Sequence, residues 1–176
     1  MARVTSGVVN VDMWYGNIYE LFNSGWDLGR FTEIQQIFEQ DVQIHPRLIT
    51  NQCLSCSREE KKALCVENGK YCPVIPTEFQ MNEVTPQSII DQNLREICIF
   101  EALPADRKSL WFSYIKEVVE NCMVPNALHA TFRPVTADCH EQHVVSLLKT
   151  AQYAMDMKID WDQYQSCIND QESALS

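Results

Sequence analysis

The chain has 176 residues, of which 45% are apolar and 22% charged, a composition typical of one folded globular domain. Fourteen basic residues against 24 acidic ones give a formal charge of -10. That charge repels phosphate backbones and anionic headgroups, so we expect no nucleic-acid partner. Every apolar run is far shorter than the ~20 residues needed to cross a bilayer, so we expect no direct membrane insertion of this chain.

The N-terminal part of the sequence predicts a strand, a helix and a second strand. Residues 7–15, GVVNVDMWY, are rich in β-branched and aromatic side chains, as is typical of a buried strand. After a turn cluster, apolar residues recur at helical spacing, and residues 32–39 contain no helix breaker. Residues 42–49, VQIHPRLI, alternate and contain Pro46, which favours a strand near a sheet edge. Strand, helix, strand implies parallel pairing through a right-handed crossover.

From Thr50 onward the periodicity becomes helical, and we expect a lobe of short helices. Ser57 and Glu60 form a candidate capping box for a helix that Gly69 would close. Asp138 and Asp160 are expected to cap two later helices. The later helices are predicted at residues 88–103, 109–122, 139–157 and 161–168. The clearest apolar stripe consists of Trp111, Tyr114, Ile115, Val118 and Cys122; in residues 88–103 the stripe is Ile90, Leu94, Ile97, Cys98 and Glu101.

Eight cysteines form an even set that is dense for a chain of this size. They are Cys53, Cys56, Cys65, Cys72, Cys98, Cys122, Cys139 and Cys167. Such a set is typical of a disulfide framework, so we expect the lumen of the secretory or endomembrane pathway, or an extracellular location. A disulfide needs Cα atoms about 4.4–6.8 Å apart, so the helices that carry cysteines must pack as a small bundle. We favour Cys122 with Cys139, because only a loop separates their helices. The other pairings stay open.

Other candidate chemistry has simpler structural interpretations. The four cysteines of residues 53–72 could bind zinc, but their second pair does not repeat the two-residue gap of a zinc ribbon. Cys139, His140 and His143 could bind a metal or activate a nucleophile. We expect instead that Cys139 is bridged and that His143, on an apolar stripe, is a core histidine. The tryptophans Trp14, Trp26, Trp111 and Trp161 are expected to pack in the core and the lobe. We therefore expect no catalytic residue, no cofactor and no metal.

Six stretches of the chain resemble the central luminal region of the vacuolar sorting receptors. They are VDMWYGNIYELF near the start, NGKYCPV at 68–74, SIIDQNLREICIF at 88–100, VVENC at 118–122, ADCHEQ at 137–142 and QSCIND at 165–170. The resemblance implies an α/β fold that is mostly helical overall: a thioredoxin-like domain interrupted by a large disulfide-stapled helical insertion. Residues 1–50 would be the partial thioredoxin-like segment and residues 51–176 the Cys-rich helical lobe. The family continues beyond Ser176, so we expect a fragment or subunit of a larger assembly.

The resemblance implies a non-catalytic protein-binding domain that works in protein transport. The partner would be protein cargo or an assembly partner, such as a chain that completes the sheet, because two parallel strands are marginal alone. It would contact the lobe or the open sheet edge. The alternative is a thiol-disulfide oxidoreductase of lysosomal thiol reductase type that uses Cys53 and Cys56. In thioredoxin-like folds, however, the reactive pair follows the first strand, and residues 23–29 contain no cysteine.

Overall fold

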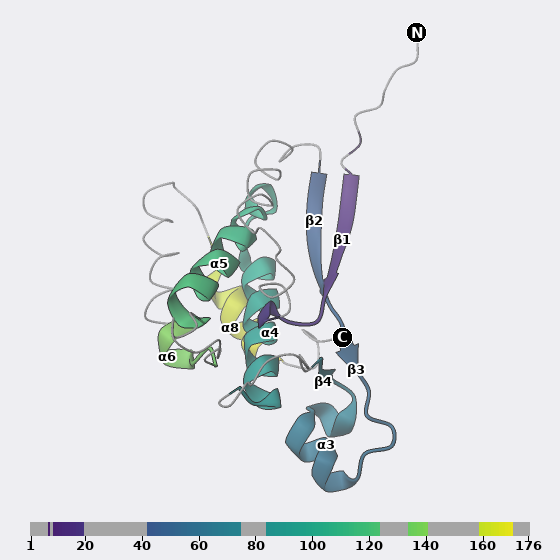
Figure 1. The fold of residues 1–176 in the computed structure, drawn as a ribbon. Coiled ribbons are helices and arrows are strands. Elements are labelled where there is room, and N and C mark those ends of the chain that lie inside the picture. The colour runs from purple at the N-terminus through teal and green to yellow at the C-terminus, as the bar shows by residue number, and fades with distance from the viewer. Residues whose placement is uncertain are drawn as a thin grey trace.

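The computed structural model describes residues 7, 9–19, 42–74, 84–123, 134–140 and 159–170. The elements are β1 (Val9–Tyr15), β2 (Val42–Leu48), β3 (Thr50–Asn51), α3 (Arg58–Leu64), the 3-10 turn η1 (Glu67–Gly69), β4 (Cys72–Pro73), α4 (Pro86–Ala102), the 3-10 turn η2 (Ala105–Arg107), α5 (Leu110–Val118), the π turn η3 (Val119–Met123), α6 (Ala137–Cys139) and α8 (Trp161–Asn169). In this part of the chain, β1 and β2 lie beside a group of helices, and α3 lies at one end (Figure 1). The α/β architecture with a larger helical portion is confirmed.

The two predicted strands form a parallel pair. Their register runs from Val9 opposite Val42 to Tyr15 opposite Leu48, one residue against one throughout. Pro46 therefore lies inside a regularly paired strand. The predicted helix over residues 32–39 lies outside the described residues.

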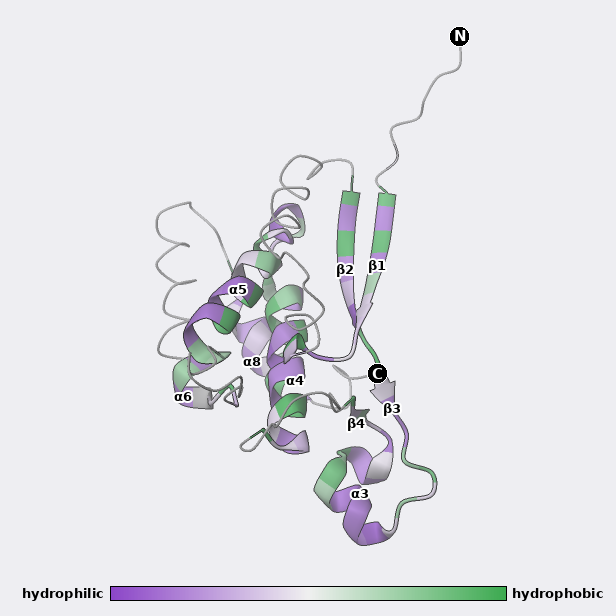
Figure 2. Cartoon of the chain, viewed as in Figure 1, coloured by the Kyte–Doolittle hydropathy of each residue, from purple (hydrophilic) through white to green (hydrophobic). Residues whose placement is uncertain are grey.

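Side chains alternate between the two faces of the strand pair, and Figure 2 shows this as alternating hydropathy along β1 and β2. Met13, Tyr15 and Ile44 belong to the buried core. On the opposite face, Arg47 forms an ion pair with Asp12 at 2.8 Å. The alternation thus directs one face of the pair into the helical layer.

The long helix α4 is the centre of the packing. Thr85 and Ser88 form a reciprocal capping box at its start, and Pro86 occupies the first turn, where its missing N–H costs nothing. The predicted stripe was partly wrong, since Ile97 is only half-buried and Glu101 is exposed. It was also too narrow, because Ile89, Ile99 and Phe100 are buried outside it. The strands, α5 and α8 all contact α4, so most of its circumference is buried rather than one face.

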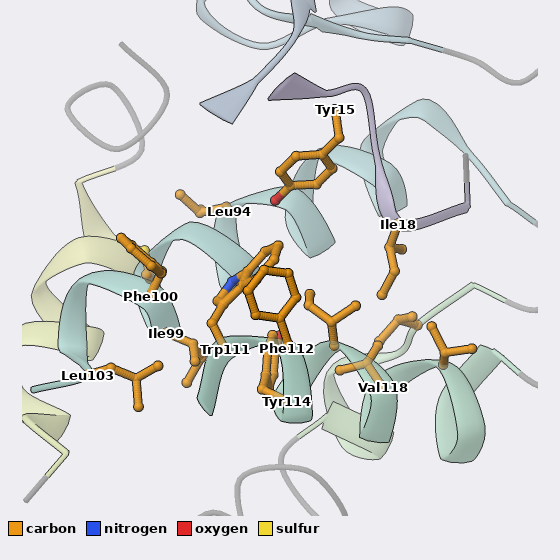
Figure 3. Packing of buried hydrophobic residues seen from close by; sticks show 14 of the residues in the cluster. Tyr15, Ile18, Leu94, Ile99, Phe100, Leu103, Trp111, Phe112, Tyr114 and Val118 are labelled. Atoms are coloured by element: carbon orange, nitrogen blue, oxygen red, sulfur yellow. The ribbon is translucent and has the colours of Figure 1, made fainter. Parts of the chain in front are cut away.

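The apolar stripe predicted for the next helix is confirmed. Trp111, Tyr114, Ile115 and Val118 are fully buried, and Cys122 on η3 is 7% exposed. Figure 3 shows the ring of Tyr15 directed from β1 towards Trp111, and the two ring centroids are 5.8 Å apart. This aromatic contact joins the strand pair to α5.

The segment between β3 and β4 folds as predicted at its start but not at its end. Ser57 and Glu60 form the expected capping box. The helix stops at Leu64, well before Gly69, because Cys65 is extended and bonded to Cys72. The chain then reverses through η1, where Gly69 adopts φ +94°.

Two further expectations are corrected, and one is confirmed. Thr136, not Asp138, accepts the backbone N–H of Cys139 at 3.1 Å, because α6 already begins at Ala137. Trp14 is 61% exposed, since it lies on the strand face opposite the core. Asp160 caps α8 as predicted, accepting from the backbone N–H of Gln163 at 2.8 Å.

Trp26 and His143 lie outside the described residues, as do residues 141–157 of the predicted helix. The division of the chain at residue 50 stays a prediction. In the described part, residues from both sides of that boundary share one core.

Candidate functional site: the disulfide framework, the buried polar network and the β1 edge

All eight cysteines lie in the described residues, and together they form four disulfides. The pairs are Cys53–Cys56, Cys65–Cys72, Cys98–Cys167 and Cys122–Cys139, with Cα separations of 5.4, 4.2, 5.5 and 5.9 Å. The last pair is the one that the sequence favoured. Cys98–Cys167 joins α4 to α8, and Cys122–Cys139 joins η3 to α6. These two bonds therefore hold the helical lobe together across long separations in the sequence.

The Cys53–Cys56 bond closes a small loop between β3 and α3. The backbone N–H of Cys53 donates to the carbonyl of Gly69 at 3.1 Å, which holds the start of the loop against η1. Leu54 within the loop is 85% exposed. Figure 1 shows the segment between β3 and α3 on the side away from the helical layer. The loop is accessible, and all four sulfurs of residues 53–72 are oxidised rather than available as thiolate ligands.

Of the residues considered from sequence as a metal or nucleophile site, Cys139 and His140 lie in the described part of the chain, and Cys139 is bridged as expected. Cys139 is bonded to Cys122, and His140 is fully buried. Across the residues that the structure describes, no group of three or more His, Cys, Asp or Glu side chains is arranged to hold a metal ion.

His140 takes part in a buried polar network around Glu96. The Tyr15 hydroxyl donates to Glu96 Oε2 at 2.9 Å, and Gln92 Nε2 donates to Glu96 Oε1 at 2.9 Å. Gln92 Nε2 also lies 3.4 Å from the Tyr114 hydroxyl, which is hydrogen-bonded to His140 Nε2 at 3.0 Å. The network thus connects β1, α4, α5 and the end of α6.

Burial perturbs both titratable ends of this network. It raises the pKa of the Glu96 carboxyl to about 7, although the hydrogen bonds from Gln92 and Tyr15 act in the opposite direction. It lowers the pKa of His140 to about 3, and the positive charge of Arg95 adds to that effect. Near pH 6 both groups are therefore neutral, so a carboxylic acid and an imidazole coexist in the core without a buried charge.

The strand pair presents a third feature, which we call the β1 edge: Val9, Val11 and Trp14. Their exposed fractions are 56%, 42% and 61%. Because successive side chains of a strand point to opposite faces, those of Val9 and Val11 lie on one face of β1 and that of Trp14 lies on the other. Among the residues that the structure describes, β1 pairs with β2 alone. Apolar side chains therefore flank the side of β1 on both faces.

Comparison with known families decides the relationship of the chain. The sequence profile described as "Vacuolar sorting receptor thioredoxin-like domain" matches residues 27–176. The chain belongs to this family. Membership agrees with the strand pair, the helical lobe and the four disulfides described above.

Individual relatives of this vacuolar sorting receptor domain share less than a third of their aligned residues with it. Vacuolar-sorting receptor 1 of Pisum sativum is 27% identical over 97 residues, which is 52% of this chain and 16% of the relative. Vacuolar-sorting receptor 2 of Arabidopsis thaliana is 28% identical over 100 residues, 54% of this chain and 16% of the relative. The matched region is thus a small part of each of these receptors. In the described part of the chain, each helix is too short or too polar to span a membrane.

Sequence reasoning missed the polar network of this vacuolar sorting receptor domain. One signal was present: Gln92 and Glu96 lie four residues apart on a helix, so they share a face. Ile89, three residues before Gln92, and Ile99, three residues after Glu96, lie on that face as well. A polar pair among apolar neighbours indicates a buried hydrogen bond once the helix is known to be covered on several sides. That coverage depends on tertiary contacts, which the helical period alone does not provide.

Proposed function

We propose that this chain is a non-catalytic protein-binding domain of a vacuolar-sorting-receptor-like protein. It would work in the lumen of the endomembrane pathway or outside the cell, where protein cargo or an assembly partner binds the β1 edge. Segment 1–50 would supply the sheet and residues 51–176 the stabilising lobe. Family membership and four disulfides support such a location, because disulfides persist in oxidising compartments.

The observation that carries the proposal is the exposure of Val9, Val11 and Trp14 around a strand that, among the described residues, has one neighbour. A two-stranded sheet is marginal, and parallel sheets are usually covered on both faces. An extended segment that paired with β1 would satisfy backbone groups along its side and would contact apolar side chains on both faces. This is the mode of recognition called β-augmentation.

A binding role without turnover is supported by the oxidation of the cysteines and by the burial of His140. Each cysteine is bonded, and His140 is enclosed by Tyr114 and Tyr164, with ring centroids 5.7 and 6.3 Å away. A general base must reach its substrate, and this imidazole is fully buried. Protein contact therefore accounts for the exposed features better than catalysis.

The test compares Trp14→Glu with Leu54→Glu, a matched change at an exposed apolar residue on another part of the surface. An array of purified secretory-pathway proteins is screened with the wild-type protein, and calorimetry then measures the affinity of each binder. We expect Trp14→Glu to weaken binding at least about tenfold, or about 1.4 kcal/mol, and Leu54→Glu to leave it unchanged. Equal effects of the two variants would contradict the β1 edge as the binding site. Catalytic reduction of a disulfide substrate that depends on Cys53 would contradict the non-catalytic role.

A further inference from the structure

The four disulfides differ in how far their sulfurs are shielded. Each of three bonds contains at least one buried member: Cys98 is 0% exposed, and Cys65, Cys72 and Cys122 are 6%, 7% and 7% exposed. In the fourth bond, both Cys53 and Cys56 are only half-buried. Thiol–disulfide exchange needs an approach to a sulfur atom. Cys139 and Cys167 are half-buried as well, so the bonds to Cys122 and Cys98 can be approached at one sulfur, whereas both sulfurs of Cys53–Cys56 can be approached.

The same bond constrains the shortest stretch of chain. Cys53 and Cys56 are three positions apart, whereas the other pairs are separated by 7, 17 and 69 positions. A disulfide restricts the unfolded chain less when it closes a smaller loop. Opening Cys53–Cys56 is therefore expected to remove less stability than opening any of the other three bonds.

Contacts on both sides of the loop would survive its opening. On one side, the N–H of Cys53 is held by the Gly69 carbonyl at 3.1 Å. On the other side, the capping box of Ser57 and Glu60 has bonds of 2.8 and 3.2 Å, and it fixes the start of α3. Only Leu54 and Ser55, both exposed, lie between the two cysteines. The conformational effect of reduction would thus be confined to this loop.

We propose that Cys53–Cys56 is an exchangeable disulfide, which opens and re-forms with external thiols while the other three bonds stay closed. The co-reactant is a thiol, either glutathione or the dithiol of a partner protein. This property lies beyond the proposed binding role and does not depend on it.

The chemistry balances without a cofactor. A thiolate attacks the sulfur of one cysteine, a mixed disulfide forms, and the Cys53–Cys56 bond breaks as the other cysteine leaves as a thiolate, which takes up a proton. A second thiol, deprotonated, attacks the external sulfur of the mixed disulfide and releases the remaining cysteine. Two external thiols are oxidised to one disulfide, and one protein disulfide is reduced to two thiols. The reverse sequence closes the loop.

The experiment incubates the folded protein in glutathione buffers of increasing reducing strength, quenches with acid, alkylates the thiols and maps the labels by peptide mass spectrometry. We expect Cys53 and Cys56 to be labelled at glutathione ratios at least about tenfold less reducing than those that open Cys65–Cys72, their nearest neighbour in the chain. Opening of Cys53–Cys56 together with Cys65–Cys72, or after it, would overturn the proposal.

Matched double variants provide a second readout. Cys53→Ser/Cys56→Ser is expected to keep the other three disulfides and the wild-type circular dichroism, whereas Cys65→Ser/Cys72→Ser removes a buried bond and is expected to lose structure around η1. Hydrogen exchange of the selectively reduced wild type should increase in residues 52–57 alone. An increase that spreads through α4 would also overturn the proposal. The binding test of the β1 edge uses fully oxidised protein, so the two proposals can fail separately.

Discussion

Replacing either titratable end of the buried network should make the unfolding free energy depend on pH in a range where that of the wild-type protein is nearly constant. The two changes are Glu96→Gln and His140→Gln, which keep hydrogen-bonding groups of similar size in the core. Both side chains are 0% exposed, so solvent cannot easily compensate for a charge at either position.

The sign of each contribution follows from the direction of the pKa shift. The folded Glu96 carboxyl has a pKa of about 7 against an ordinary value of 4.5, so its stabilising effect is present below pH 4.5 and is lost as the pH rises through 7. The folded His140 imidazole has a pKa of about 3 against 6.5, so its effect is present above pH 6.5 and is lost as the pH falls through 3.

Between pH 4.5 and 6.5 the two effects oppose each other. The folded state holds one proton on Glu96 that the unfolded state has released, and the unfolded state holds one on His140 that the folded state lacks. Each contribution changes by about 3 kcal/mol over these two pH units, since one pKa unit corresponds to about 1.4 kcal/mol. The pair therefore leaves the unfolding free energy of the wild type nearly constant across this window.

The variants separate the two contributions. Relative to the wild type, Glu96→Gln should lose about 3 kcal/mol of unfolding free energy as the pH falls from 6.5 to 4.5, because His140 then acts alone. His140→Gln should gain about 3 kcal/mol over the same change, because Glu96 acts alone.

The assay is guanidinium unfolding of the oxidised protein at several pH values, followed by tryptophan fluorescence. Glu101→Gln, at an exposed position on the same helix, is the control and should follow the wild type. If the Glu96→Gln and wild-type curves stay parallel from pH 6.5 to 4.5, the folded carboxyl is not protonated there and the reasoning is refuted.

Four further variants test the packing of the domain by chemical denaturation. Cys98→Ala/Cys167→Ala should cost about 4 kcal/mol, because the bond spans 69 positions; a cost near zero would show that packing alone joins α4 to α8. Trp111→Ala should cost about 3–5 kcal/mol because its ring is fully buried, and Trp14→Ala, at 61% exposure, under about 0.5 kcal/mol; similar costs would contradict the described burial. Gly69→Ala should cost about 1–2 kcal/mol, because φ is +94° and a Cβ would lie 2.8 Å from Lys61 Cγ; no cost would mean that the turn adapts.

Features set by nearby residues could be predicted from the sequence. The parallel strands followed from their alternation and from the connection between them. The Ser57 and Asp160 caps followed from side chains that can reach backbone N–H groups three residues away. The buried face of α5 followed from helical period, because that helix is covered on one side by a continuous apolar layer.

Features set by distant residues could not be predicted in this way. The end of α3 depends on a bond from Cys65 to Cys72 and on pairing of Val66 with Tyr71. The strand pattern of β1 did not reveal which face the helices cover, so Trp14 was wrongly expected in the core. The environment of Glu96 depends on Tyr15, 81 positions away. Local periodicity contains no information about such partners.

The position of the polar network also constrains how a partner could use β1. The C-terminal end of the strand is fixed: the Tyr15 hydroxyl reaches Glu96 at 2.9 Å, and Asn93 donates to the Gly16 carbonyl at 3.2 Å. The N-terminal end carries the exposed Val9 and Val11. Core contacts fix one end of β1 in place. A segment that pairs with the other end therefore meets a strand that is already positioned, and less conformational entropy is lost on binding. The network would thus support binding at the β1 edge without lying in it.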